Sequence, residues 1–233
     1  MTYKNVCEGV FLSRPNRFIA KVQIDGTEQT VHVKNTGRCR ELLISGCTVY
    51  LEKSSNPQRK TAFDLIAVKK QRENMPDLLI NMDSQAPNKA AFEWIKGGLF
   101  SQNAAVYAEK TYGKSRFDLY VEDGDKKAFV EVKGVTLEDS GVALFPDAPT
   151  ERGVKHIREL VAAVKDGYQA YILFVVQMKG VHVYRPNKLM HPEFADALRD
   201  AQAAGVNILA VDCTVTPKSM SIDKFIDTEI TAY

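Results

Sequence analysis

Alternating hydrophobic and polar positions divide this chain of 233 residues into two parts that meet near residue 82. In the first part, short runs of β-branched and aromatic residues alternate with polar ones between turn residues, which is typical of strands. Asp25 and Gly26 predict a hairpin turn, and residues 38–43 are a candidate short helix. The predicted strands are residues 9–12, 17–24, 29–33, 48–52 and 62–69.

The second part mixes helical and strand patterns. Residues 82–88 are polar, contain Pro87 and indicate a linker, so we expect an all-β domain over residues 1–82 and an α/β domain over residues 83–233. The apolar run at 169–177 is typical of a strand buried on both faces of a mixed sheet, whereas the tail after Pro217 is polar and has no clear pattern. The predicted helices are residues 88–97, 151–165 and 192–204, and the predicted strands are 103–109, 115–121, 128–134, 169–177, 181–184 and 208–213.

A predicted hairpin carries Asp118 on its first strand and Glu131 and Lys133 on its second. Strand side chains alternate between faces, so Glu131 and Lys133 share a face. With Gly124 and Asp125 as the loop, Asp118 falls opposite Glu131; with a loop shifted back by one residue, the two carboxylates are diagonal neighbours. The residues then expected on the other face are Phe117, Leu119 and Val121 on one strand and Ala128, Val130 and Val132 on the other.

Two carboxylates placed across a strand pair lie on the order of 5 Å apart and repel each other. A divalent cation between them turns the repulsion into binding, since magnesium or manganese takes carboxylate oxygens as ligands. The pattern therefore predicts a metal site at Asp118 and Glu131. A solvated hairpin face with a Glu131–Lys133 pair fits the same spacing.

Charge is distributed unevenly along the chain. Residues 1–80 carry 13 Lys and Arg against 8 Asp and Glu, a net of +5, and residues 81–233 carry 18 against 21, a net of −3. A basic domain beside a carboxylate-bearing one suits a polyanion held near a metal site, although a solvated basic rim is the alternative. The residues expected to follow phosphate groups are Arg14, Arg17, Lys34, Arg38 and Arg40.

Cysteine spacing and hydropathy limit the class of protein. The four cysteines are scattered without a close pair of the usual zinc spacing, and they favour reduced thiols in the cytoplasm. No apolar run approaches membrane-spanning length, and the first residues lack a signal-peptide pattern. We expect a cytoplasmic protein that does not bind membranes; its oligomeric state, a homodimer included, stays open.

Element order and motifs together resemble known families. Five strands and a small helix in about eighty residues resemble an OB-fold barrel, a count that other small barrels share. The αβββαβ order of the second part, with Asp118 on its second strand and Glu131-x-Lys133 on its third, resembles the PD-(D/E)XK nuclease superfamily, with Phe117 in place of the proline. Residues 145–160, 35–37, 115–118 and 131–136 resemble the sugar fermentation stimulation protein family.

The resemblance implies an N-terminal OB-like domain, a nuclease-like second domain and DNA as the partner. It implies that Asp118 and Glu131 ligate one or two magnesium ions and that Lys133 helps activate water. Glu93 matches the extra acidic residue that such nucleases carry on the preceding helix. On the helix after Thr150, the residues expected near phosphate are Arg152, Lys155 and His156, the last also as a proton donor.

Three functions follow from these observations. The first is a metal-dependent nuclease acting on DNA, for which Asp118, Glu131 and Lys133 are all present. The second is a non-catalytic DNA-binding regulator of sugar-metabolism genes, as the family name implies, although no helix-turn-helix or other sequence-reading motif is evident. The third is an RNA-binding or RNA-processing protein, because OB-folds accept either nucleic acid.

Overall fold

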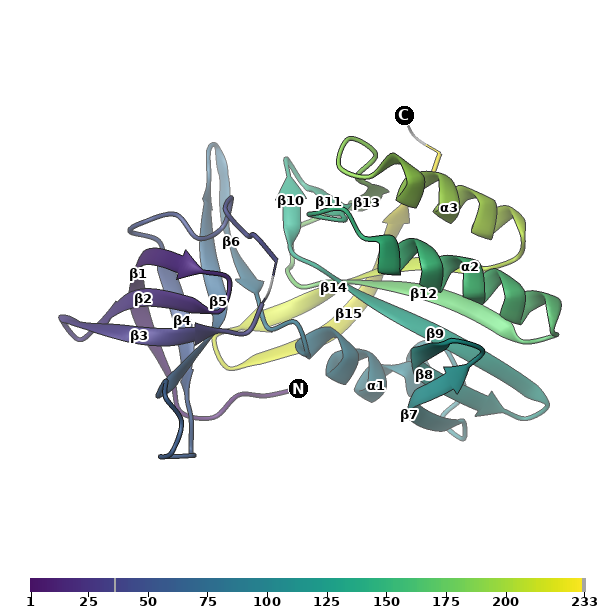
Figure 1. The fold of residues 1–233 in the computed structure, drawn as a ribbon, viewed down its shortest axis with the longest axis horizontal. Helices are drawn as coiled ribbons and strands as arrows, with labels where there is room; N and C mark the ends of the chain where they lie inside the picture. Colours follow the sequence, from purple (N-terminus) through teal and green to yellow (C-terminus); the bar gives the residue numbers. More distant parts are fainter. Residues whose placement is uncertain (36, 232–233) are drawn as a thin grey trace.

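Two β-sheets organise the chain, and the computed structural model describes residues 1–35 and 37–231 (Figure 1). The N-terminal sheet has the strand order β3-β2-β1-β4-β5-β6. A further parallel pairing joins β3 to β5 through His32–Asp64 and Val33–Leu65, which closes five of the strands into a barrel. This confirms the OB-like all-β domain. Its strands are β1 (Val6–Asn16), β2 (Ile19–Ile24), β3 (Thr27–Val33), β4 (Thr48–Lys53), β5 (Phe63–Arg72) and β6 (Met75–Asn81).

Two details of the barrel differ from the prediction. Strand β6 pairs antiparallel with β5 and was not predicted from the sequence, because its first three residues are exposed and include Pro76. The expected helix over residues 38–43 is a single turn, in which the N–H groups of Leu42 and Leu43 both donate to the Cys39 carbonyl. Cys39 has φ +45°, outside the helical region, so the turn cannot continue from the preceding residues.

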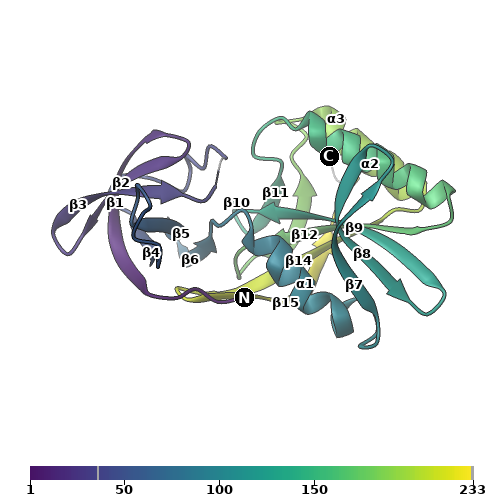
Figure 2. The same cartoon turned by 60° about the horizontal axis from the view of Figure 1, so that its bottom comes forward.

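The second sheet is mixed and has nine strands in the order β10-β11-β13-β15-β14-β12-β9-β8-β7. Strands β9, β12 and β14 run parallel in its centre, where β12 is almost entirely buried as predicted. Helix α1 covers one face, and α2 and α3 lie side by side on the other (Figures 1 and 2). The strands are β7 (Ala105–Tyr112), β8 (Ser115–Asp123), β9 (Lys126–Val135), β10 (Leu137–Asp139), β11 (Val142–Phe145), β12 (Gln169–Val176), β13 (Val183–Pro186), β14 (Asn207–Thr216) and β15 (Ser219–Thr228); the helices are α1 (Ala86–Gly98), α2 (Glu151–Lys165) and α3 (Pro192–Ala203).

The αβββαβ order holds with insertions. A short hairpin, β10–β11, lies between β9 and α2, and the tail with no clear pattern forms β15. Strand β15 pairs antiparallel with β14 and buries Met220 and Ile222 among polar neighbours. The alternation of buried and exposed residues is typical of a half-buried strand. The strand was not predicted, because many of its exposed residues are charged and the segment as a whole is polar. No helix among residues 1–35 and 37–231 is long and apolar enough to span a membrane.

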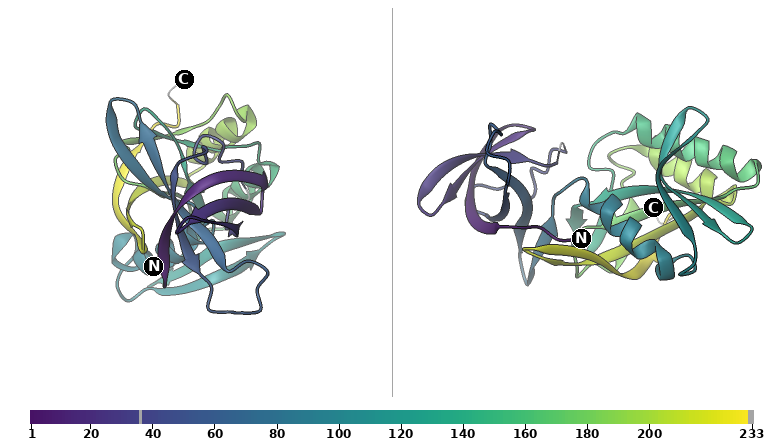
Figure 3. Two further views of the ribbon diagram at one scale, coloured as in Figure 1. Left: turned by 90° about the vertical axis from the view of Figure 1, so that its left-hand side faces the viewer. Right: turned by 90° about the horizontal axis from the view of Figure 1, so that it is seen from below.

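Buried polar contacts join the barrel to the second domain. Gln177, at the end of β12, donates to the backbone and side-chain oxygens of Asn81 at 3.0 and 3.1 Å and to the Asp83 carbonyl at 3.2 Å. Lys34 of the barrel forms a 2.7 Å ion pair with Asp83, which is fully buried. The right-hand view of Figure 3 shows the two domains side by side, and β6 is followed by α1 along the chain at this junction. The contacts fix the barrel relative to the β9 end of the mixed sheet.

Candidate functional site

The β8–β9 hairpin turns at Gly124 and Asp125, which confirms the first of the two predicted registers. Asp123 pairs with Lys126, and the ladder continues to the pair Leu119–Val130, where it stops. Extending the register by one step places Asp118 opposite Glu131. The two carboxylates therefore lie on neighbouring strands at the point where the strands separate.

The side chain of Asp118 replaces the missing backbone pairing. Its Oδ2 accepts a 2.8 Å hydrogen bond from the Val132 N–H, and its Oδ1 accepts a 2.7 Å bond from Asn88 Nδ2 on α1. On the other side of β8, no backbone pair joins Asp118 to Glu109, which has φ +58°. The strand is therefore irregular at Asp118, and the carboxylate turns toward the start of α1.

Because of this irregularity, the prediction that Phe117 shares a face with Leu119 and Val121 is wrong. Leu119 and Val121 pack in the core beneath α1, as expected, but Phe117 belongs to the core beneath α2. Its ring lies 5.3 Å from the Phe129 ring and 6.1 Å from the His156 ring, measured between centroids. Strict alternation along β8 fails because the chain rotates at Asp118.

Glu131 is 3% exposed and has two unlike carboxylate oxygens. Oε1 accepts hydrogen bonds from Lys133 Nζ at 2.5 Å and from His156 Nδ1, whereas Oε2 is buried and has no hydrogen-bond partner. Burial alone raises the pKa of Glu131, but the His156 hydrogen bond and the Lys133 charge outweigh it, so its pKa lies below the usual value. Glu131 is held as a carboxylate with one unused oxygen.

The pKa of Asp118 is shifted the opposite way. Burial raises it first and the negative charge of Glu131 raises it further, against the hydrogen bond from Val132 and the charge of Lys133. Two neighbouring carboxylates, of which one raises the pKa of the other and has a buried oxygen without a partner, form an all-oxygen donor set that suits magnesium or manganese. The residues present therefore fit a hard divalent cation.

Helix α2 brings His156 to this site. Thr150 caps the helix by accepting the Gly153 N–H at 3.1 Å on its hydroxyl oxygen, as predicted for this position. Arg152 Nε donates to His156 Nε2 at 3.4 Å, which leaves the ring proton on Nδ1, facing Glu131. The hydrogen-bonded chain from Glu131 through His156 to Arg152 thus reaches the exposed surface of α2. Lys155 is not part of this chain, because its ammonium donates to the Lys114 carbonyl at 3.2 Å.

Glu93 does not contact the hairpin carboxylates. It lines a hollow of about 400 Å³ that Asp118 also lines, but its Oε2 forms a 2.7 Å ion pair with the amino group of Met1. The α1 residue in contact with Asp118 is Asn88, one turn earlier, which sequence reasoning missed. The sequence signal for Asn88 is its place beside Pro87 in the first turn of α1.

The predicted basic residues of the barrel separate into two groups. Arg14, Arg17, Arg38 and Arg40 line a hollow of about 520 Å³, whereas Lys34 is turned away to Asp83. Arg14 also has a structural role, since its guanidinium donates to the carbonyls of Arg38, Arg17 and Asn35. Thr36, part of the motif at residues 35–37, lies outside the described residues.

A third hollow, of about 370 Å³, lies between the domains and was not predicted. Asn35 and Gly37 of the barrel line one part of it, and Gly134, Asp147 and Gln177 line others. Burial raises the pKa of Asp147. The packing of the two domains creates this hollow, so a local sequence pattern could not predict it.

One further group, Glu151, His191 and Glu193, brings three possible metal ligands together within the described chain. The sequence showed no such grouping around His191. Its Nδ1 faces the Thr150 N–H at 3.3 Å, which places the ring proton on Nε2, toward the two carboxylates. A protonated Nε2 is a donor to glutamate rather than a metal ligand, so this group stabilises the starts of α2 and α3.

Comparisons with known proteins cover nearly the whole chain. The family model described as the SfsA N-terminal OB domain matches residues 12–76, and the sugar fermentation stimulation protein RE domain matches residues 85–219. Sugar fermentation stimulation protein homologs of Desulfitobacterium hafniense strain Y51 and Ruminiclostridium cellulolyticum are each 56% identical, over 99% of this chain and 99% and 100% of theirs.

A solved structure agrees in fold. The SfsA protein of Pyrococcus furiosus, determined in complex with Ca²⁺, superimposes with a TM-score of 0.86 at 27% identity, covering 98% of both chains. The barrel, the mixed sheet and the matched family models agree along both domains. The chain belongs to the sugar fermentation stimulation protein family.

Proposed function

We propose that this protein is a magnesium- or manganese-dependent phosphodiesterase that acts on DNA. The observation that carries the proposal is the buried, unpartnered Oε2 of Glu131 beside the carboxylate of Asp118. A buried oxygen without a hydrogen bond costs stability, and a bound cation removes that cost. The PD-(D/E)XK-like order of elements supports a divalent cation at this position, and the P. furiosus relative was determined in complex with a divalent cation, Ca²⁺.

Asp118 and Glu131 would hold the cation. A bound cation supplies an acidic water at neutral pH and neutralises charge that develops on the phosphodiester. The protein keeps Glu131 ionised through His156 and Lys133, and it fixes Asp118 through the Val132 N–H and Asn88. Neither carboxylate needs to reorganise before it binds a ligand.

Lys133 and His156 supply positive charge and a proton at the same place. The Lys133 ammonium is bound to Glu131 Oε1 on the face that the substrate phosphate must approach. With a cation held by Oε2, the Lys133 ammonium on Oε1 would lie beside it and could orient a water or the phosphate. Arg152 neutralises phosphate charge from the exposed side of His156. Four free cysteines fit the reducing cytoplasm, in which we place the protein.

A cleavage assay tests the proposal. Wild type, Lys133→Ala and the control Lys127→Ala are incubated with single-stranded, duplex and branched DNA in magnesium, manganese or chelator. Lys127 lies on the same strand but is exposed and remote from Glu131, so its variant should cleave like wild type. We expect metal-dependent cleavage that Lys133→Ala loses. Absence of cleavage of every substrate in both metals overturns the catalytic proposal.

A second function has one observation in its favour. The Lys133 ammonium is already ion-paired at 2.5 Å, as in a site that only binds its ligand. We therefore keep a non-catalytic DNA-binding role as the alternative. DNA binding that persists in chelator and in Lys133→Ala, with no product in any metal, would favour it over the phosphodiesterase.

A further inference from the structure

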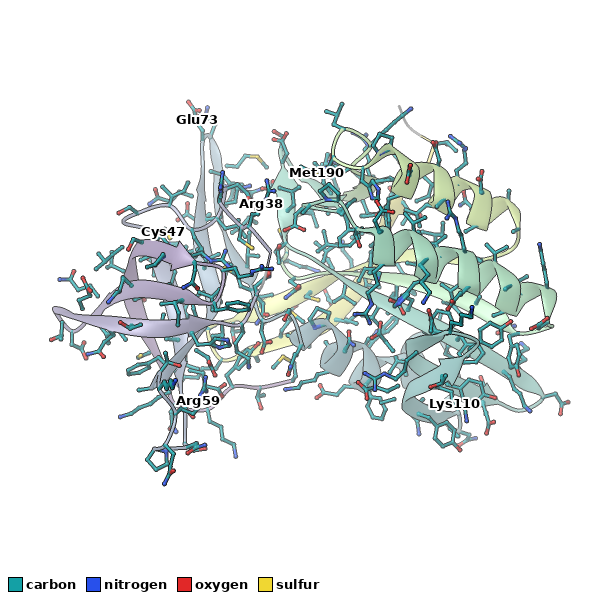
Figure 4. All side chains as sticks on the ribbon, viewed as in Figure 1. Arg38, Cys47, Arg59, Glu73, Lys110 and Met190 are labelled. Carbon is teal, nitrogen blue, oxygen red and sulfur yellow. The ribbon has the colours of Figure 1, made fainter. Side chains whose placement is uncertain are left out.

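The basic hollow of the barrel contains three arginines that form no ion pair among the described residues; the charge of one of them, Arg38, reaches Asp147 and opposes the rise of its pKa. Arg17, Arg38 and Arg40 form no ion pair within the described residues, and no Asp or Glu lines this hollow. Figure 4 shows Arg38 on the side of the barrel that faces the second domain. Guanidinium groups that line one hollow of about 520 Å³ have the chemistry to bind phosphate groups.

An exposed aromatic ring adjoins these arginines. Phe18, at the β1–β2 turn, is 49% exposed, and the Arg17 guanidinium lies 5.5 Å from its ring centroid. The backbone of Phe18 is fixed, because its N–H donates to Asn16 Oδ1 at 2.9 Å and its carbonyl accepts the Val33 N–H at 2.8 Å. A ring on a fixed turn loses little conformational entropy on binding a flat partner.

The basic hollow adjoins the hollow between the domains. Gly37 and Ala148 line both of them, and the hollow between the domains is also lined by Gly134, at the end of β9. Gly37 approaches the second domain so closely that a Cβ there would lie 2.7 Å from Asp147 Oδ2. A chain bound on the arginines therefore lies next to the domain junction.

We propose that Phe18, Arg17, Arg38 and Arg40 bind single-stranded DNA, with one unpaired base stacked on Phe18 and the phosphates on the arginines. A duplex keeps its bases stacked on each other and offers no free base face to an aromatic ring, whereas a single strand does. DNA as the ligand rests on the proposed function. The strand type rests on Phe18 and the arginine hollow alone.

Fluorescence anisotropy in chelator tests this proposal without requiring cleavage. The probes are a fluorescein-labelled oligothymidylate of about 15 nucleotides, matching the ~4–16 nucleotides that one OB-fold binds, a hairpin duplex of similar length and the corresponding oligouridylate. Wild type should bind the oligothymidylate more tightly than the duplex. Phe18→Ala should weaken that binding on the order of tenfold and leave duplex binding nearly unchanged.

Two variants serve as controls. Phe18→Tyr keeps a stacking ring and should bind like wild type. Phe225→Ala removes a ring that is 47% exposed on β15 and lines none of the hollows described above, and it should also bind like wild type. Far-UV circular dichroism and urea unfolding of each variant distinguish a binding defect from misfolding.

Several outcomes would overturn the proposal. They are duplex binding as tight as single-strand binding, an equal loss on both probes in Phe18→Ala, and no loss at all. Tighter binding of the oligouridylate would identify RNA instead of DNA. Because the assay contains no metal, single-strand binding without any cleavage in magnesium would leave this inference standing while the phosphodiesterase proposal fails.

Discussion

His156 donates from Nδ1 to Oε1 of Glu131 and so joins α2 to β9 behind the candidate metal centre. The hydrogen bond has an electrostatic consequence, because it is the largest influence that lowers the pKa of Glu131 against its burial. The helix therefore helps Lys133 to lower the pKa of Glu131 against the effect of its burial.

Replacing His156 by Ala should raise the pKa of Glu131, because the strongest of the contacts that oppose its burial is removed. Cations bind the carboxylate form, so the pH below which Mn²⁺ affinity falls should move upward, and the affinity at pH 5 should drop on the order of tenfold. Isothermal titration of Mn²⁺ between pH 5 and 8 measures the change. His182→Ala, at an exposed histidine on another segment, should keep the wild-type profile. An unchanged profile in His156→Ala would show that the hydrogen bond does not control the site.

Asp118→Asn should weaken metal binding far more than it destabilises the metal-free protein. The substitution removes a ligand and one hydrogen-bond acceptor, but it also removes the repulsion that raises the pKa of Asp118 beside Glu131. We expect Mn²⁺ affinity to fall at least about 100-fold and the unfolding free energy in chelator to change by less than about 1.5 kcal/mol. Asp125→Asn, in the turn of the same hairpin, should change neither quantity. A large loss of stability in Asp118→Asn would instead indicate a structural carboxylate.

Local sequence patterns predicted the parts of this site that depend on one hairpin. Gly124 and Asp125 specify the turn, and the turn sets the register that brings Asp118 near Glu131. The rotation of β8 at Asp118 was not predictable, because it depends on Glu109 in the neighbouring strand and on Asn88 in α1. Contacts between elements distant in sequence leave no periodic signal.

The basic residues of the barrel show the same limit. The sequence prediction placed Arg14, Arg17, Lys34, Arg38 and Arg40 together along phosphate groups; the four arginines line one hollow, and Lys34 does not. Lys34 directly follows β3, a position from which its side chain was expected to lie on the rim of the barrel. In the structure, its ammonium instead forms a 2.7 Å ion pair with buried Asp83 at the junction of the two domains. Which cations remain free for a ligand depends on where the acidic groups of the other domain lie, which a single sequence does not reveal.

Gly134→Ala should destabilise the protein by about 1–3 kcal/mol, as overpacking does in tight sites. A Cβ at this position would lie 2.5 Å from Gln177 Oε1 and 2.6 Å from Pro87 Cγ, so β9, β12 and the start of α1 cannot keep their spacing. Urea unfolding measures the loss. Ala108→Gly on the exposed side of β7 controls for the general effect of changing Gly and Ala in a strand and should cost less than about 1 kcal/mol. A wild-type midpoint for Gly134→Ala would contradict this packing.

Glu138→Gln should weaken the attachment of the barrel to the mixed sheet. The Glu138 side chain is fully buried and binds Lys70 at 2.6 Å and Arg72 at 3.2 Å, both on β5. Removing one partner of a buried ion pair leaves the others uncompensated, so we expect a loss of about 3 kcal/mol in unfolding free energy at pH 7. Glu28→Gln, in an exposed pair with Lys21, should cost less than about 1 kcal/mol.

The pH dependence of the Glu138 effect follows from the direction of its pKa shift. Burial raises this pKa, but the hydrogen bonds from Lys70 and the Gly141 N–H outweigh it, and the folded-state pKa lies below the usual value. The carboxylate therefore contributes its full stability above the unfolded-state pKa of about 4.3 and loses it as the pH falls through the lower folded-state value. The difference in unfolding free energy between wild type and Glu138→Gln should be constant from about pH 6 to 8 and shrink below about pH 4. A difference that persists at acid pH would show that the substituted amide disrupts packing rather than charge pairing.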